Sequence, residues 1–292
     1  MVTVGDYVST TPETGRAAAD VAPEPSRFSL RHPKSRLGFV RPRVWLPLVL
    51  MIVVLGALWE WGASSMPYLL PKLSAIGRAL ADDPGYYLDN ALVTLWEALL
   101  GLAIGFAAAF VLAVLVSELP WARRAIMPVA VVLNVTPLVA IAPVLVVAFG
   151  FGPEPKLIVT GLICFFPILI NTSVGLRAVP PAVVQVYRTV NASRLEMLWW
   201  IRVPSSLPFL FAALRIVFPL SIVGAVVAEM SAPGAAEGLG TAISLASTMN
   251  QLAVVYASIA ILALMGSLLL LIVTTVERRM LHWHESTQGA NY

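Results

Sequence analysis

Six long apolar segments, separated by shorter polar stretches, dominate the chain. Each has about 20 residues or more, and a helix that rises about 1.5 Å per residue then crosses the roughly 30 Å hydrocarbon core of a bilayer. The pattern therefore predicts an all-α integral membrane protein with six transmembrane helices. The predicted spans are 44–63, 91–116, 125–149, 156–176, 206–230 and 252–276.

Polar segments precede, separate and follow these spans. Residues 1–43 hold few large apolar side chains and many Pro, Ser and Thr, so we expect a disordered tail whose basic end contacts anionic membrane lipids. Residues 64–90 form a predicted outer segment with a surface helix over 72–81. The outer loop 231–251 is predicted to carry a short helix lying on the surface. Residues 284–292 form a second tail.

The positive charges are distributed unevenly among the loops. Fifteen of the 19 lysines and arginines fall in the first tail, the turn after the second span, the loop between the fourth and fifth spans and the end of the chain. Cytoplasmic loops carry this excess, so both termini are predicted to be cytoplasmic. The charge is not gathered on a folded soluble face, which argues against nucleic-acid binding.

Several side chains within the spans invite a functional or a structural interpretation. The prolines at 128, 137 and 143 are equally consistent with a transport path and with packing kinks. Glu97 is interpreted as an acid paired with a neighbouring helix rather than a gate. Arg215 is interpreted as structural, either snorkelling or paired inside the bundle. The small residues at 101, 105, 108 and 109 favour close helix packing. Candidate lining of a translocation path comprises Asn134, Thr136, Asn171, Thr172 and Ser221.

The loop 178–205 is the most cationic interruption between two apolar spans, and its pattern is helix, break, helix. Residues 182–190 suit a short helix. Asn191 tolerates the left-handed conformation that ends a helix, and Ser193 is a good cap for the next one. Ser206 is predicted to begin the fifth span, with Pro208 in its first turn. A helix pair exposed to the cytoplasm suits contact with a cytosolic partner.

Composition excludes most soluble and enzymatic classes. Apolar residues make up 59% and charged residues 12%, about half the charged share of an ordinary soluble domain. No Gly-x-x-x-x-Gly-Lys-Ser/Thr phosphate loop is present, and no catalytic constellation is evident. The single Cys164 is expected to be a buried hydrophobe. His32, His282 and His284 offer no metal site.

The loop resembles the EAA loop of ATP-binding-cassette (ABC) importer permeases. That motif has Glu-Ala-Ala, three residues, Gly, nine residues, then an apolar residue three before Pro. Here the matching positions are Gln185-Val186-Tyr187, Asn191, Ile201 and Pro204. This chain departs from the motif in its neutral Gln185, in the larger residues that replace both alanines, and in Asn191. The surrounding sequences FFPILINTSVGLRAVPP and LRIVFPLSIVGAVVAEM are similar to those of the permease branch that carries nitrate, sulfonates, taurine and thiamine precursors.

The resemblance implies a type I importer permease of the bacterial inner membrane, with its core at 91–283. It implies two cytosolic ATPase subunits, which hold ATP and Mg, a second permease copy and an extracytoplasmic solute-binding protein. This chain itself would bind no cofactor. The residues that the resemblance places against the ATPase are Gln185, Tyr187, Arg188, Val190, Asn191 and Ser193.

A self-contained secondary transporter or channel is the alternative. Such a protein needs its own coupling-ion site, and the sequence shows neither a clear midplane acid nor a convincing inverted repeat. The exposed helix pair therefore favours the importer. Sequence leaves the substrate open among sulfonates, taurine, nitrate and vitamin precursors, with a lean toward the precursors, and leaves homodimer and heterodimer open.

Overall fold

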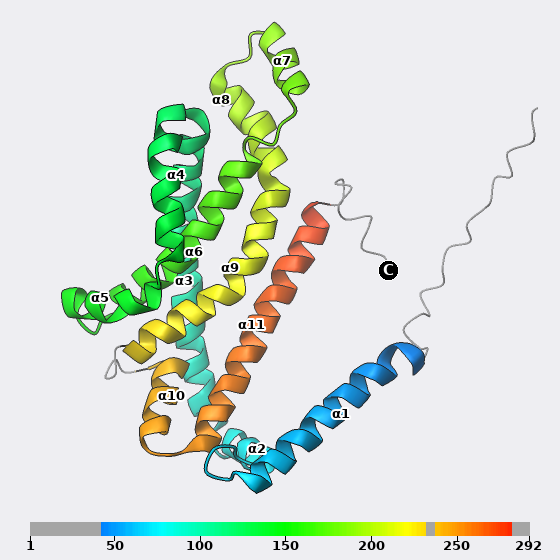
Figure 1. Ribbon diagram of the computed structural model, residues 1–292, viewed down its shortest axis with the longest axis vertical. Coiled ribbons are helices and arrows are strands. Elements are labelled where there is room, and N and C mark those ends of the chain that lie inside the picture. Colours follow the sequence, from blue (N-terminus) through cyan, green and yellow to red (C-terminus); the bar gives the residue numbers. More distant parts are fainter. Residues whose placement is uncertain (1–41, 232–236, 282–292) are drawn as a thin grey trace, which may run out of the picture. The chain divides into compact units, whose positions relative to one another are not determined.

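The structure is a computed structural model that describes residues 42–231 and 237–281 (Figure 1). Apart from its last two residues, the predicted first tail lies outside the described residues, as do the predicted second tail and all three histidines. The chain divides into two units, Met1–Val53 and Val54–Tyr292. The first contributes only the beginning of α1, Pro42–Ser65, where a run of exposed apolar side chains suits a lipid-facing helix.

The second unit is all helical in its described part. After α1 come α2 Leu73–Asp82, α3 Pro84–Glu118, α4 Pro120–Val135, the 3₁₀ helix η2 Leu138–Ile141, α5 Ala142–Phe149, α6 Pro153–Gly175, α7 Pro181–Thr189, α8 Arg194–Met197, the π-helical turn η3 Leu198–Arg202, α9 Val203–Ser231, α10 Leu239–Thr248 and α11 Leu252–Met280. The predicted surface helix at 72–81 is confirmed as α2, shifted by one residue.

Five of these helices are long and apolar enough to cross a membrane: α1, α3, α6, the continuous helix Arg194–Ser231, and α11. The predicted span at 125–149 is not one helix. Thr136 has an extended backbone, because the following Pro137 disfavours helical geometry at the residue before it. Pro143 lies in the first turn of α5, where its missing N–H is not needed. A sixth crossing by this broken segment stays a prediction.

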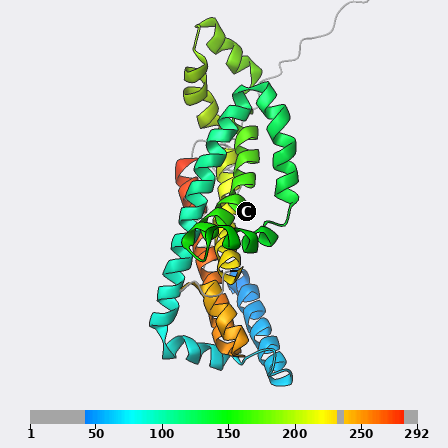
Figure 2. The ribbon, with the colours of Figure 1, turned by 90° about the vertical axis from the view of Figure 1, so that its left-hand side faces the viewer.

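Helix α6 lies between α3 and α9 and forms the centre of the bundle (Figures 1 and 2). The backbones of α3 and α6 approach closely where glycines face each other. A Cβ atom on Gly105 would lie 2.4 Å from the carbonyl oxygen of Gly161, and one on Gly101 would lie 2.6 Å from the Cβ of Thr160. The predicted small-residue face is thus confirmed at Gly101, Gly105 and Ala109, whereas Ala108 is exposed.

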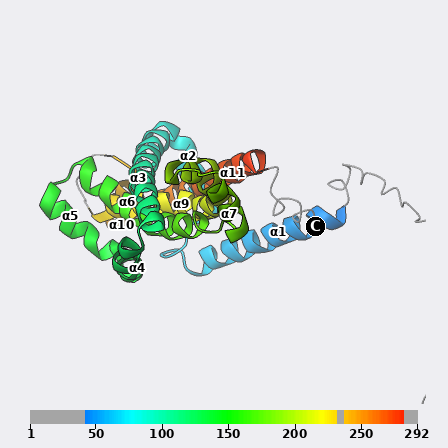
Figure 3. The same cartoon turned by 90° about the horizontal axis from the view of Figure 1, so that it is seen from above.

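The apolar core extends along both sides of α6. One cluster includes Ile168 and Leu169 of α6, Leu176 directly after it, and Leu210 and Val217 of α9. Seen from above, α5 and α11 lie on opposite sides of this core (Figure 3). The fold therefore places a closely packed three-helix centre between two outer helices.

Two predicted elements differ from the structure. Ser206 does not begin a helix, because the helix starts at Arg194 and runs through Pro204 and Pro208 to Ser231. The π turn before Pro204 widens the hydrogen-bond ladder, which relieves the loss of its N–H. The predicted helix of the outer loop is α10, but Leu239, Ala242 and Ile243 are buried, so it packs into the bundle rather than lying on its surface.

Replacing Gly105 with Ala tests the close approach of α3 and α6. The added methyl meets backbone rather than a movable side chain, so Gly105→Ala should lower the free energy of unfolding by about 1–3 kcal/mol. Gly266→Ala on α11 is the matched control, because a Cβ there meets nothing within 4 Å. Thermal unfolding in detergent measures both. Equal melting temperatures for the two variants would contradict this packing.

Candidate coupling site

Helix α7 ends in a turn that depends on Asn191. Asn191 has φ 53°, in the left-handed region, and its N–H donates to the carbonyl of Arg188 at 3.1 Å. The next N–H, of Ala192, donates to the carbonyl of Tyr187 at 3.1 Å. This pair of bonds is the Schellman motif, which satisfies the last carbonyls of the helix. The predicted helix end at Asn191 is confirmed.

The second helix of the loop begins with a capping box. The Ser193 hydroxyl accepts from the Glu196 N–H at 3.2 Å, and the Glu196 carboxylate accepts from the Ser193 N–H at 2.7 Å. Two otherwise unpaired donors are thereby satisfied. The predicted cap at Ser193 is confirmed. Glu196 therefore has a structural role, which the distribution of charges in the sequence did not predict.

A small apolar cluster fixes α7 to the helix that follows. Val179, Met197 and Ile201 are buried together, and Val184 and Ala192 pack against them. Because α7 has no fully buried residue of its own, this contact at Val184 is what orients it. The opposite face is bare: Val186 and Val190 are 62% and 70% exposed. These two apolar side chains are therefore available for contact with a partner.

The six residues predicted to contact the ATPase all lie in α7 and the turn after it. Their side chains are all exposed: Gln185, Tyr187, Arg188, Val190, Asn191 and Ser193. Figure 1 shows α7 and α8 at one end of the second unit, beyond the end of α4. The structure therefore gathers these residues on one protruding helix pair. Asn191 and Ser193 additionally shape the turn.

The helix pair is connected rigidly to the bundle. From Arg194 the chain continues without a break for 38 residues to Ser231. At about 1.5 Å per residue that is roughly 57 Å, far more than the 30 Å hydrocarbon core, so one end of this helix must extend into water. Arg202 forms an ion pair with Glu118 at the end of α3. Arg202 thus joins this continuous helix to the end of α3.

The five candidate path residues are not equivalent. Asn134 is exposed on α4, and Thr136 lies at the break after it, its hydroxyl donating to the carbonyl of Val132. Asn171 is partly buried and donates to the carbonyl of Pro167. Thr172 and Ser221 are fully buried within the chain. A shared role in a path stays a prediction for these residues.

A buried polar cluster at the other end of the bundle was missed by the sequence patterns. Glu229 is fully buried, and its carboxylate accepts from the Thr94 hydroxyl at 2.8 Å and from the Gly240 N–H. Thr94 also accepts from the Leu239 N–H at 2.8 Å. These bonds satisfy the first N–H groups of α10 and hold it to α3 and α9. In the sequence, Glu229 is a single acid near the end of a predicted span, and this pattern did not predict its role.

The predicted pairing of Glu97 is confirmed, and Arg215, predicted to snorkel or to pair, forms an ion pair while its side chain stays 47% exposed. Glu97 of α3 accepts from the Lys156 ammonium of α6 at 2.7 Å, and both side chains are buried. Arg215 of α9 forms an ion pair with Glu277 of α11. Glu97 is thus paired with a neighbouring helix. Each pair joins two helices within the bundle.

The fold and the protruding helix pair define a class of membrane protein, the permease subunit of an ABC importer. The fold is that of type I importer permeases. It is similar to a chain of the MetNI methionine ABC transporter in an inward-facing conformation, with TM-score 0.58, 16% identity, and coverage of 65% of this chain and 94% of that one. The resemblance inferred from the EAA loop is thereby supported at the level of the fold.

The chain belongs to the family of binding-protein-dependent transport system inner membrane components, whose model matches residues 101–282. The riboflavin transport system permease protein RibX of Chloroflexus aurantiacus is 30% identical over 258 residues, 87% of this chain and 95% of that one. The formylaminopyrimidine transport permease protein ThiX of Halalkalibacterium halodurans is 31% identical over 239 residues, 81% and 95% of the two chains. This chain is a multi-pass inner-membrane permease of an importer, a transport subunit.

Substitutions at Asn191 test the turn. Asn191→Gly should preserve it, whereas Asn191→Val should cost about 1–2 kcal/mol, because a β-branched residue is strained at positive φ. The measurement is hydrogen exchange of residues 181–193, which should be faster only in the valine variant. Gln185→Val, an exposed helical position of α7, is the control. Equal protection in all three variants would show that the turn does not depend on residue 191.

Proposed function

We propose that α7 inserts into a groove on a cytosolic ATPase subunit and receives the work of ATP hydrolysis there. The observation that carries this proposal is the exposed face of α7, with Val186 and Val190 bare on a short helix held outside the bundle. Gln185, Tyr187, Arg188, Asn191 and Ser193 complete the contact. A water-exposed apolar helix face has no use in lipid, and a complementary groove would bury it.

The proposed assembly has two copies of this chain, each docked on one of two ATPase subunits. A second copy supplies the other half of the path, and each chain offers one coupling helix. ATP and Mg belong to the ATPase, and this chain binds no cofactor. The broken segment from α4 to α5 makes the sixth crossing, both termini are cytoplasmic, and Asn134, Thr136, Asn171, Thr172 and Ser221 line the path.

In this mechanism the ATPase subunits close on ATP and draw the two α7 helices together. Val184 carries the movement to Met197 and Ile201, and the continuous helix from Arg194 carries it into α9. The ion pair of Arg202 with Glu118 moves α3 with it. The permease opens outward to accept solute from its binding protein, and hydrolysis restores the inward state. These contacts provide a contiguous route for the coupling.

Charge reversal at Arg188 tests the docking. Arg188→Glu should weaken assembly with the ATPase at least about tenfold and reduce stimulation of ATP hydrolysis in parallel, because the exposed cation lies in the proposed contact. Arg78→Glu on α2, also an exposed arginine, is the control and should retain both activities. Intact assembly and stimulation in Arg188→Glu would refute docking through α7.

We infer further that the cargo is a heterocyclic vitamin or vitamin precursor. The support is the similarity over most of the chain to permeases named for riboflavin and for formylaminopyrimidine. Relatives named for aliphatic sulfonates and taurine are 26% and 30% identical, the latter over only 58% of this chain.

The cargo is tested in proteoliposomes that contain the complete importer and its binding protein. Riboflavin or a formylaminopyrimidine should stimulate ATP hydrolysis and accumulate inside, while taurine and nitrate should do neither. Stimulation by taurine alone would show that the cargo is a sulfonate. That result would leave the docking of α7 untouched, because the Arg188→Glu experiment does not depend on which solute is carried.

A further inference from the structure

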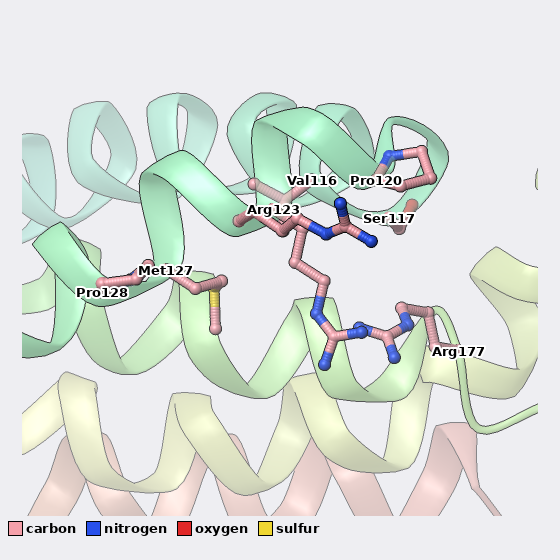
Figure 4. Close-up of a pocket in the computed structure, with 8 residues that line it drawn as sticks. Val116, Ser117, Pro120, Arg123, Met127, Pro128 and Arg177 are labelled. Atoms are coloured by element: carbon pink, nitrogen blue, oxygen red, sulfur yellow. The ribbon is translucent and has the colours of Figure 1, made fainter.

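A concave pocket lies between the start of α4 and the segment that follows α6. Its volume is about 530 Å³, within the range of small-molecule sites. Three arginines line it, two from the first turns of α4 and one from just beyond α6: Arg123, Arg124 and Arg177. Figure 4 shows Arg123 and Arg177 reaching into the same space from these two elements. None of the residues assigned to coupling or to the path lines this pocket.

The positive charge in the pocket is not compensated by any residue that the structure describes. Within residues 42–231 and 237–281, none of the three arginines forms an ion pair or a side-chain hydrogen bond. Partial desolvation lowers the pKa of Arg177, and the charges of Arg123 and Arg202 lower it further. Arg202 is already paired with Glu118. Like charges held this close favour an anion between them.

The pocket has two features that suit a position near a membrane surface. It begins where the long apolar helix α3 ends, and the adjacent Trp121 is 69% exposed, as in the aromatic belts at membrane interfaces. One wall is apolar, formed by Val116, Met127 and Pro128. Beyond it α4 continues with the exposed Val129 and Val132. The cationic pocket is thus continuous with an exposed apolar side of α4.

The three arginines and the adjacent apolar side of α4 together fit one kind of ligand. A free phosphate would use the arginines but gain nothing from Met127, Pro128 and the apolar side of α4. An acidic segment of the ATPase would likewise leave that side bare. A phospholipid has an anionic group and acyl chains joined in one molecule, and basic pockets between membrane helices on the cytoplasmic side bind such head groups.

We propose that this pocket binds the head group of an anionic phospholipid, whose phosphate lies among Arg123, Arg124 and Arg177 and whose acyl chains lie along α4. The lipid then bridges the start of α4 and the segment that leads into α7. Placement in the cytoplasmic leaflet rests on the proposed function. Binding of the lipid does not, since it requires neither the ATPase nor transport.

The experiment is a lipid titration of the full chain in detergent, followed by native mass spectrometry. Phosphatidylglycerol should bind tighter than phosphatidylcholine by at least tenfold. Arg123→Gln/Arg177→Gln should weaken phosphatidylglycerol binding on the order of 25-fold, since each arginine near a membrane surface contributes about fivefold. Lys72→Gln/Arg78→Gln removes two charges elsewhere and should change nothing. Arg123→Lys/Arg177→Lys keeps the charge and should retain most binding, which separates loss of the site from loss of folding.

Three results would overturn the proposal. Equal affinity for the two lipids would show that no anionic site exists. Displacement of phosphatidylglycerol by millimolar inorganic phosphate, with equally tight binding of phosphate alone, would make this a phosphate site. Unchanged lipid affinity in Arg123→Gln/Arg177→Gln, together with failure to assemble with the ATPase, would make it a protein contact. A failure of docking through α7 would leave the lipid titration unaffected.

Discussion

The main constraint on this structure is that the helix beginning at Arg194 is longer than the hydrocarbon core of the membrane is thick. The helix that begins at Arg194 has 38 residues, and roughly 20 suffice to cross the hydrocarbon core. Its surplus must extend into water, and it carries the π turn, the capping box and the apolar cluster around Met197. Helix α7 is thus packed against an extension of a membrane span, and this contact is the one through which the proposed coupling would act.

The opposite end of the same helix is fixed by buried polar contacts. Glu229 accepts bonds from Thr94 and from the start of α10, and nearby Glu97 is paired with Lys156. Separating such buried polar groups from their partners is costly, so these contacts stabilise this end of the bundle. Between the two ends, the glycine contact of α3 with α6 permits close packing without bulky side chains. One helix therefore links the exposed pair α7 and α8 to the packed core of the bundle.

Local patterns in the sequence predicted the coupling loop well. Asn191 and Ser193 act through their own backbone and near neighbours, so their roles as helix end and helix cap are visible without tertiary context. The amphipathic and apolar periods likewise predicted α2, α3, α6 and α11. The sequence did not predict which prolines break a helix and which are accommodated within one. Pro137 ends helix α4. Pro204 is accommodated by the preceding π turn, which the spacing of hydrophobic residues does not predict.

Other features depend on partners distant in the chain. Glu229 is bonded to Thr94, 135 residues away, and the N–H groups of Leu239 and Gly240 donate to these two side chains, which holds α10 against the bundle. The arginine pocket joins Arg123 with Arg177, which belong to different loops of the sequence. A single sequence read alone does not show which loops meet. The family resemblance supplied the class of protein, but its motif said nothing of these contacts.

The most direct test of the account is labelling of a cysteine placed at Val190, with Arg78→Cys as the control on the opposite side. The native Cys164 is fully buried and does not interfere. In sealed membrane vesicles, an impermeant maleimide should modify residue 190 only from the cytoplasmic side, and assembly with the ATPase should protect it. Modification from the exterior, or undiminished labelling in the assembled complex, would contradict the claim that α7 docks on a cytosolic ATPase.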